Sequence, residues 1–170
     1  MRWNPAYVGI GSNLQQPAKQ VHRAFAALAT IPLTRLEISS SLYGSEPLVP
    51  AQPQFVNAVA GLLTQLEVLP FFEALRGLEV LLGRQPPPRE RWGPRLIDLD
   101  LLLFGQLRLD GSELTLPHPG IVQRNFVLYP LCEVAPDLNV PGCGRVAALA
   151  AGVQSAGVWR LNDETTINGA

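Results

Sequence analysis

The sequence predicts an α+β fold, a ferredoxin-like α/β sandwich with a mainly antiparallel sheet and C-terminal additions. The main observation is the element order: strand-like runs with a period of two and two amphipathic helical runs follow one another as strand, helix, strand, strand, helix, strand. No repeat, low-complexity tract or linker divides the 170 residues, so one domain over 1–170 is expected. This fold hosts many functions and cannot identify one alone.

The first half of the chain supplies the first strand and helix and a second strand. Residues 6–10 read as a buried strand, and GIGSNL, which holds only part of GxGxxG, reads as a plain strand-to-helix turn. Pro17 can start a helix, in which Val21, Phe25 and Leu28 recur at helical spacing. Residues 36–43 are β-compatible, and the three prolines of 44–53 predict a loop.

The next strand is predicted over 55–64 and carries a polar residue near its start. Alternation places Phe55, Asn57 and Val59 on one face. Asn57 either caps the neighbouring loop or hydrogen-bonds the edge of a ligand, and the pattern leaves both open.

The second helix is predicted over 69–82, followed by shorter elements. Its apolar stripe is Phe71, Leu75, Leu78 and Leu82, Gly83 ends it, and Glu79 lies off the stripe. Beyond the next strand we expect a hairpin over 105–111, a short strand over 114–116, and helices over 126–134, despite Pro130, and over 146–151.

The most informative motif is residues 91–104, RWGPRLIDLDLLLF. Strand alternation puts Asp98 and Asp100 on one face and Ile97, Leu99, Leu101 and Leu103 on the other. Two charges roughly 6.6 Å apart repel by about 2.5 kcal/mol at an effective dielectric of about 20. Carboxylates so placed in an apolar run need a cation.

Two explanations of this carboxylate pair remain open. Arg91 and Arg95 could compensate the charge in a structural salt-bridge cluster. Alternatively, arginine is the preferred ligand of phosphate oxygens, so the pair could be a site where a divalent metal meets polyphosphate. Residues 84–95, with four prolines and four arginines, form a stiff basic loop before the strand, and His118 is held between two prolines downstream.

Composition excludes several classes of protein. A net charge of −1 argues against nucleic-acid binding. No apolar run reaches the roughly 20 residues of a membrane span, and the N-terminus lacks the apolar stretch of a signal peptide, so a cytoplasmic protein is expected. Cys132 and Cys143 lie in no metal-binding spacing and are expected to be thiols. There is no P-loop motif GxxxxGK[ST].

Taken together, RWGPRLIDLDLLLF, the early GSNL, the step Phe55-Val56-Asn57, and the Pro-His-Pro followed by Arg124 and Phe126 closely resemble the 6-hydroxymethyl-7,8-dihydropterin pyrophosphokinases of folate biosynthesis. The resemblance runs from about residue 6 to 140. The resemblance implies an enzyme that moves the β,γ-pyrophosphoryl group of ATP to the hydroxymethyl group of the reduced pterin and releases AMP. Such transfer depends on in-line positioning and charge stabilisation.

The resemblance also implies roles for individual residues. Asp98 and Asp100 would bind two Mg²⁺ ions. The catalytic set would be Arg84, Arg95, Asp98 and Asp100. ATP would be bound by Arg91, His118 and Arg124, with Glu79, Leu101 and Thr115 near its adenosine end. The pterin would be bound by Ser45, Leu48, Phe55, Asn57, Trp92 and Phe126. A monomer acting on two small molecules is expected, with no nucleic-acid or membrane partner.

The sequence departs from the family pattern in the loop after Arg84. It reads QPPPRE where many members carry further basic residues, and Ser45-Glu46 stands where Thr-Pro is common. A catalytically weak paralogue that binds pterin or nucleotide in a regulatory role is therefore the alternative. A nucleic-acid-binding ferredoxin-like domain is a third hypothesis, but the chain lacks an aromatic RNP-type strand and a basic surplus.

Overall fold

The computed structural model describes residues 1–84 and 93–162, and its main feature is a six-stranded sheet. The elements are β1 (Asn4–Ser12), α1 (Pro17–Leu28), β2 (Thr34–Ser39), β3 (Tyr43–Ser45), β4 (Phe55–Thr64), α2 (Val68–Leu81), β5 (Asp98–Phe104), β6 (Leu109–Asp110), β7 (Thr115–Leu116), α3 (Asn125–Val134), β8 (Asn139–Val140), β9 (Gly144–Arg145), α4 (Val146–Gly152) and β10 (Val158–Arg160). The strand order in the sheet is β10-β3-β4-β1-β5, and β2 also pairs with β4.

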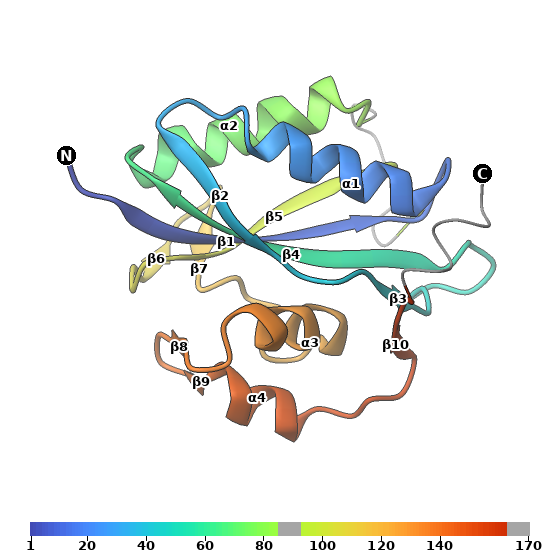
Figure 1. Ribbon diagram of the computed structural model, residues 1–170. Helices are drawn as coiled ribbons and strands as arrows, with labels where there is room; N and C mark the ends of the chain where they lie inside the picture. The colour runs from blue at the N-terminus through green and yellow to red at the C-terminus, as the bar shows by residue number, and fades with distance from the viewer. Residues whose placement is uncertain (85–92, 163–170) are drawn as a thin grey trace.

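The sheet is antiparallel, and its centre is formed by β4 and β1. β1 pairs with β4 on one side and with β5 on the other, while β2 and β3 both pair with the far side of β4. Helices α1 and α2 cover one face of the sheet, and α3 and α4 lie on the opposite face (Figure 1). The predicted order of strands and helices and the ferredoxin-like class are confirmed, and the second helical layer is the predicted C-terminal addition.

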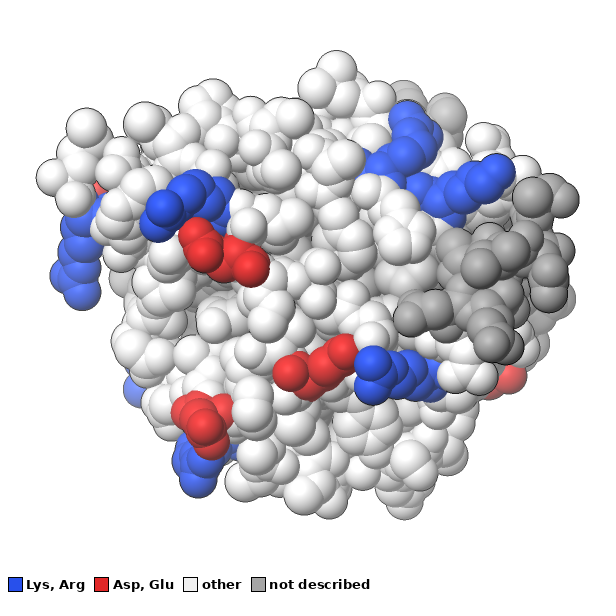
Figure 2. Space-filling view, in the orientation of Figure 1, with Lys and Arg blue, Asp and Glu red and all other residues white. Residues whose placement is uncertain are grey.

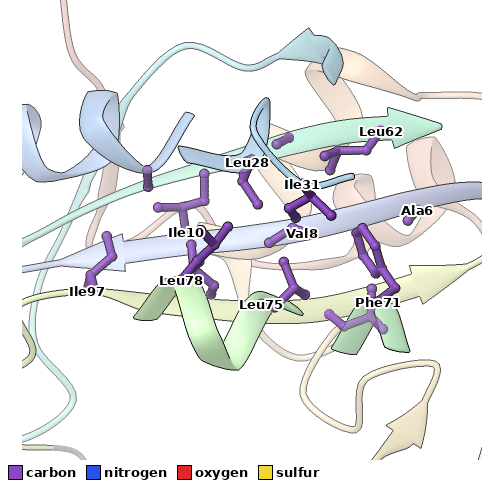
Figure 3. Packing of buried hydrophobic residues seen from close by; sticks show 14 of the residues in the cluster. Ala6, Val8, Ile10, Leu28, Ile31, Leu62, Phe71, Leu75, Leu78 and Ile97 are labelled. Atoms are coloured by element: carbon purple, nitrogen blue, oxygen red, sulfur yellow. The ribbon is translucent and has the colours of Figure 1, made fainter. Parts of the chain in front are cut away.

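Two apolar clusters fill the spaces between these layers. The first packs side chains of β1, such as Val8 and Ile10, against Leu28 of α1 and the predicted stripe of α2 (Figure 3). The second contains Val59 and Leu102 of the sheet with Leu131 of α3. Because both faces of the central strands are buried, their sequences are nearly continuous apolar runs.

The predicted strand over 36–43 is in fact two strands. Ser40 separates them: its N–H donates to Val59 O at 2.8 Å, and its hydroxyl accepts the Val59 N–H at 2.9 Å. Strand β2 therefore ends at Ser39, and β3 includes Gly44 and Ser45, where a loop was predicted. That part of the loop prediction was wrong because the prolines that discourage pairing begin only at Pro47.

The alternation predicted for the aspartate strand breaks at a β-bulge. Val8 pairs with Leu101 but Tyr7 pairs with Leu103, so Leu102 is an extra residue in β5. Leu99 and Leu101 lie in the first cluster as predicted, whereas Leu103 joins the second cluster on the opposite side. The placement predicted for Leu103 was therefore wrong, because a bulge reverses the side-chain alternation beyond it.

The other predicted elements are found close to their predicted bounds. The helices predicted over 69–82, 126–134 and 146–151 correspond to α2, α3 and α4, and Pro130 lies inside α3. The hairpin predicted over 105–111 lies further along the chain: β6 pairs with β7, which is the short strand predicted over 114–116, and residues 111–114 connect them. Glu79, which lies off the apolar stripe of α2, is nevertheless buried.

No helix among the described residues is long and apolar enough to cross a lipid bilayer. On the face shown in Figure 2, basic and acidic side chains are scattered and adjoin one another. Cys132 and Cys143 are free thiols; Cys132 is partly buried and Cys143 is exposed.

The packing of α2 can be tested by truncating Phe71, which is fully buried and lies 6.0 Å from the Phe104 ring centroid. We expect Phe71→Ala to lower the free energy of unfolding by about 3–5 kcal/mol in urea titrations, because it leaves a cavity. Leu81→Ala, on the same helix but 80% exposed, is the control and should change it by less than about 0.5 kcal/mol. Equal effects would contradict the packing described.

Candidate active site

A pocket of about 330 Å³ opens at the end of the sheet where β1, β4 and β5 meet the start of α3. It collects most of the side chains that the sequence singled out. Its predicted members are Ser45, Leu48, Phe55, Asn57, Arg84, Arg95, Asp98, Asp100, His118, Arg124 and Phe126. They come from segments more than 80 residues apart in the sequence, which only the fold brings together.

The two aspartates face the pocket from β5, opposite glycines of β1. In the antiparallel register Asp98 pairs with Gly11 and Asp100 with Gly9, and both glycines line the pocket. A Cβ at Gly11 would lie 3.5 Å from Asn57 Oδ1. Because these positions carry no side chain, the floor beside the carboxylates stays open to a ligand.

Arg84 and Glu79 connect this strand to α2. Arg84 Nη1 lies 3.4 Å from Asp98 Oδ1 and forms an ion pair with Glu79. Glu79 Oε2 also accepts the Leu99 N–H at 3.0 Å. Burial raises the pKa of Glu79, although the Leu99 hydrogen bond and Arg84 oppose that shift. Glu79 thus fixes both the guanidinium and the strand backbone.

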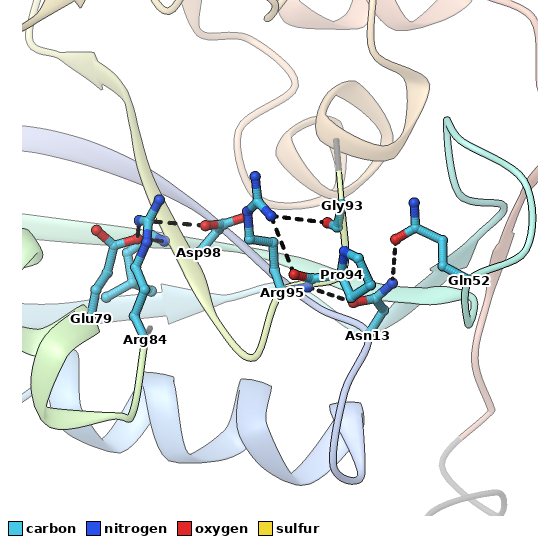
Figure 4. A network of polar contacts seen from close by, with 9 residues as sticks. Asn13, Gln52, Glu79, Arg84, Gly93, Pro94, Arg95 and Asp98 are labelled. Carbon is cyan, nitrogen blue, oxygen red and sulfur yellow. Dashed lines mark hydrogen bonds and ion pairs between the residues drawn. The ribbon is translucent and has the colours of Figure 1, made fainter. Parts of the chain in front are cut away.

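Arg95 is held in place from the turn after β1 (Figure 4). Asn13 Oδ1 accepts the Arg95 N–H at 2.8 Å, and the Asn13 N–H donates to Arg95 O at 3.0 Å. The Asn13 amide nitrogen donates to Gln52 Oε1 and Pro53 O, both at 3.0 Å. The Arg95 side chain donates to the carbonyls of Gly93 and Pro94 and lies 3.8 Å from Asp98 Oδ2. Asn13 therefore joins two loops that flank the pocket.

Asp100 is the carboxylate better suited to a ligand. Within residues 1–84 and 93–162, ion pairs are formed by Asp98 but not by Asp100. Asp100 is accessible from the pocket, yet the surrounding protein displaces bulk water and raises its pKa, a shift that Arg124 and Arg84 oppose. A purely structural salt-bridge cluster would pair both carboxylates, so this asymmetry favours the hypothesis of a binding site.

The donor set fits Mg²⁺. This ion takes hard oxygen ligands, and it is often held by one or two carboxylates together with substrate phosphates. Asp98 and Asp100 supply such carboxylates on one pocket wall. No group of three or more His, Cys, Asp or Glu that could hold a metal occurs in the described part of the chain, so a complete protein cage is absent there.

The other end of the pocket has aromatic walls and one amide. Phe55 and Leu48 line one side and Phe126 another. Asn57 Nδ2 donates to Ser45 Oγ at 2.8 Å and to Tyr43 O at 3.4 Å. Asn57 thus ties β4 to β3, and it also lines the pocket, where its remaining polar groups could meet a ligand. The arrangement suits a flat heterocycle with polar edges.

His118 and Arg124 form the wall opposite the sheet. The Gly120 N–H donates to His118 Nδ1 at 3.1 Å, so the neutral ring carries its proton on Nε2. Burial, and then the charge of Arg124, lower the pKa of His118 to about 4. The ring is therefore a neutral hydrogen-bond donor at pH 7.

A second pocket of about 330 Å³ adjoins the first and shares Arg84, Asp100 and His118 with it. Glu79, Leu101 and Thr115, predicted near the adenosine end of ATP, line this second pocket. The Leu101 side chain is buried in the core, so it contributes little surface to this pocket. The two pockets therefore meet at the positively charged Arg84, the hydrogen-bond donor His118 and the carboxylate of Asp100.

Two predicted site residues, Arg91 and Trp92, lie outside the described residues. Sequence reasoning also gave no role to Gly9 and Gly11, which line the first pocket, or to Asn13, which holds Arg95 beside it. GSNL and the two glycines were interpreted as a plain strand and turn. The spacing Gly-x-Gly inside an apolar strand was the available signal, since both glycines then fall on one face.

The neutral state of His118 predicts a pH dependence of stability. Its pKa in the folded protein is lower than the ordinary value of about 6.5, so protonation favours the unfolded chain. This contribution is present above about pH 6.5 and is lost as the pH falls toward 4. We expect the Tm of the wild type to fall more over this range than that of His118→Gln, measured by calorimetry. Parallel Tm curves would contradict the prediction.

The chain is similar to known proteins of one family over most of its length. A family model described as 7,8-dihydro-6-hydroxymethylpterin-pyrophosphokinase (HPPK) matches residues 7–136. A 2-amino-4-hydroxy-6-hydroxymethyldihydropteridine pyrophosphokinase of Pseudomonas aeruginosa is 46% identical over 91% of this chain and 95% of its own length. Enzymes of the same name from Haemophilus influenzae and Synechocystis are 42% and 34% identical over 80% and 97% of this chain, and over 84% of their own length in each case.

Solved structures show the same fold. A structure of HPPK-DHPS in complex with substrates aligns with a TM-score of 0.69 at 11% identity, over 89% of this chain and 43% of that one. Wild-type Plasmodium falciparum HPPK-DHPS with pterin and p-hydroxybenzoate aligns with a TM-score of 0.68 at 14% identity, over 88% and 43%. This chain thus spans less than half of those solved chains, and their likeness concerns the fold. On the match of residues 7–136 and the identity to full-length relatives, the chain belongs to the 7,8-dihydro-6-hydroxymethylpterin-pyrophosphokinase family.

Proposed function

We propose that this protein transfers the β,γ-pyrophosphoryl group of ATP to the hydroxymethyl group of 6-hydroxymethyl-7,8-dihydropterin, giving the pterin diphosphate and AMP for folate biosynthesis. The observation that carries the proposal is the meeting of the two pockets at Arg84, Asp100 and His118. One pocket suits a flat pterin and the other suits adenosine, so the phosphates would lie over the carboxylates between them.

The reaction is an in-line displacement at phosphorus. The hydroxymethyl oxygen forms a bond to the β-phosphorus, the bond from that phosphorus to the oxygen bridging to the α-phosphate breaks, and the hydroxyl proton passes to solvent. The chain supplies positioning and charge rather than a covalent nucleophile. Phe55, Phe126 and Asn57 would orient the pterin, and Arg124 and the Nε2–H of His118 would hold phosphate oxygens.

Asp98 and Asp100 would hold two Mg²⁺ ions. Bound Mg²⁺ neutralises charge on the triphosphate and makes AMP a better leaving group. Arg84 and Arg95 would stabilise charge on the transferred group, since Asp98 holds both guanidiniums beside the pocket. Arg91 and Trp92 are proposed to complete the ATP and pterin sites. We propose a monomer, because residues of one chain line both pockets.

The activity is tested with purified protein, Mg²⁺, ATP and 6-hydroxymethyl-7,8-dihydropterin. AMP and the pterin diphosphate should appear in equal amounts, and omission of Mg²⁺ should stop the reaction. ADP as the product would contradict the proposal. Pterin binding without AMP release would favour the regulatory paralogue, for which the comparisons give no support.

The carboxylates are tested by Asp100→Asn, which keeps the shape of the side chain and removes its charge. We expect turnover to fall below about 1% of the wild-type rate, because the metal loses a charged ligand. The free energy of unfolding should stay equal or rise, because the repulsion between Asp98 and Asp100 is relieved. Asp110→Asn on the exposed strand β6 is the matched control. Full activity of Asp100→Asn would exclude Asp100 as a metal ligand.

Arg95 is tested by a kinetic comparison. If its side chain acts mainly in the transition state, Arg95→Ala should lower kcat and kcat/KM by about 10²- to 10³-fold with little change in KM. Arg35→Ala, at an exposed ion pair with Glu37, controls for loss of one positive charge. A loss confined to KM would assign Arg95 to ground-state binding.

A further inference from the structure

The segment 153–161 follows α4 and passes the beginning of α3 before it reaches the edge of the sheet as β10 (Figure 1). We refer to residues 153–161 as the C-terminal strap. It lies outside residues 7–136, the part of the chain that the family model matches. No residue of the strap lines the two pockets described above.

One end of the strap is fastened to α3. The Asn125 amide nitrogen donates to Gln154 O at 2.8 Å and to Ala156 O at 3.0 Å. The Tyr129 hydroxyl, one helical turn further on, donates to Val153 O at 3.3 Å. Asn125 stands between Arg124 and Phe126, which both line the first pocket. The strap therefore holds the part of α3 that forms one wall of that pocket.

The other end of the strap is fastened to β3. Val158 pairs with Ser45 and Trp159 with Gly44, and the Glu46 N–H donates to Gly157 O at 2.9 Å. The Trp159 ring packs directly on Gly44, where a Cβ would lie only 2.4 Å from it. Ser45 and Glu46 line the first pocket. The strap therefore also holds a second part of the pocket lining, the part that carries Ser45 and Glu46.

A second set of contacts joins the same elements behind the pocket. Glu133, near the end of α3, accepts hydrogen bonds from the Tyr43 hydroxyl at 2.8 Å and the Ser41 hydroxyl at 2.7 Å. Arg160 of the strap lies 3.3 Å from Glu133 and donates to Ser41 Oγ at 2.6 Å. Strap, helix and strand thus form one hydrogen-bonded unit.

We propose that the C-terminal strap is a positioning element for pterin binding, which sets the separation of the wall carrying Phe126 from the wall carrying Ser45 in the unliganded enzyme. The proposal rests on the proposed function for the identity of the ligand. When a site is held in its binding geometry beforehand, the ligand does not have to supply the free energy of ordering it. Loss of the strap contacts should therefore weaken pterin binding selectively. The second pocket, which is proposed to take adenosine, receives no strap contact, so ATP binding should change much less than pterin binding.

The first test compares Asn125→Ala with Gln154→Ala in the full-length chain. Asn125→Ala removes both hydrogen bonds to the strap, whereas Gln154→Ala truncates an exposed side chain and keeps the backbone acceptor. For Asn125→Ala we expect the KM for the pterin to rise about 5- to 50-fold, as for the loss of two hydrogen bonds. The KM for ATP and kcat should stay within about twofold, and Gln154→Ala should match the wild type.

The second test is a double-mutant cycle at the other end of the strap. Gly44→Ala places a methyl group where the Trp159 ring lies, and Trp159→Ala removes that ring. Each single variant should raise the KM for the pterin. Adding Gly44→Ala to Trp159→Ala should have little further effect, because the clash no longer exists. Calorimetry with 6-hydroxymethyl-7,8-dihydropterin alone gives the same comparison as a Kd, without requiring turnover.

The outcomes separate this proposal from the proposed function. Absence of AMP release by the wild type overturns the proposed function, while the Kd values still test the strap. The strap proposal is overturned if the wild type does not bind the pterin, if Asn125→Ala and Gln154→Ala bind it equally, or if the KM values for ATP and pterin rise together. The last result would indicate general destabilisation, which thermal melts of the same variants would also reveal.

Discussion

The antiparallel pairing of β1 with β5 is the constraint on which the rest of the site depends. It places Asp98 opposite Gly11 and Asp100 opposite Gly9, so two carboxylates stand beside a strand surface without side chains. Their mutual repulsion is tolerable because Arg84 and Arg95 lie beside Asp98. The β-bulge at Leu102 follows directly, and it returns the strand to the apolar core beyond the site. The strand is thus polar where it meets the pocket and apolar elsewhere.

Buried polar side chains hold the surrounding loops to this pair of strands. Glu79 joins α2 to the backbone of β5, and Asn13 joins the loop carrying Arg95 to the loop before β4. Both are almost fully buried, so removal of either would leave unsatisfied partners. Glu79 fixes the guanidinium of Arg84, and Asn13 fixes the backbone of Arg95. Phosphoryl-type transfer requires accurately placed positive charge, so the residues that hold the arginines in place contribute to stabilising the transition state.

Most of the fold, and the chemical character of the site, could be predicted from the sequence because they depend on local patterns. The period of the apolar residues located both helices of the first layer, and Asp98 and Asp100 stood out as charges in an apolar strand. The division at Ser40 and the bulge at Leu102 could not be predicted, since each depends on hydrogen bonds to a strand that is distant in the sequence. The role of Asn13 was missed for the same reason: its partners lie 39 to 82 residues away.

Asp98 and Asp100 are proposed to bind together the metal that accompanies ATP between the two pockets. This binding is tested most directly by anomalous diffraction from crystals grown with Mn²⁺ and a non-hydrolysable α,β-methylene analogue of ATP. We predict Mn²⁺ peaks at about 2.1–2.2 Å from carboxylate oxygens of both residues, with the triphosphate completing the coordination. A structure with the nucleotide bound and both aspartates paired only with arginines, without metal, would contradict the account.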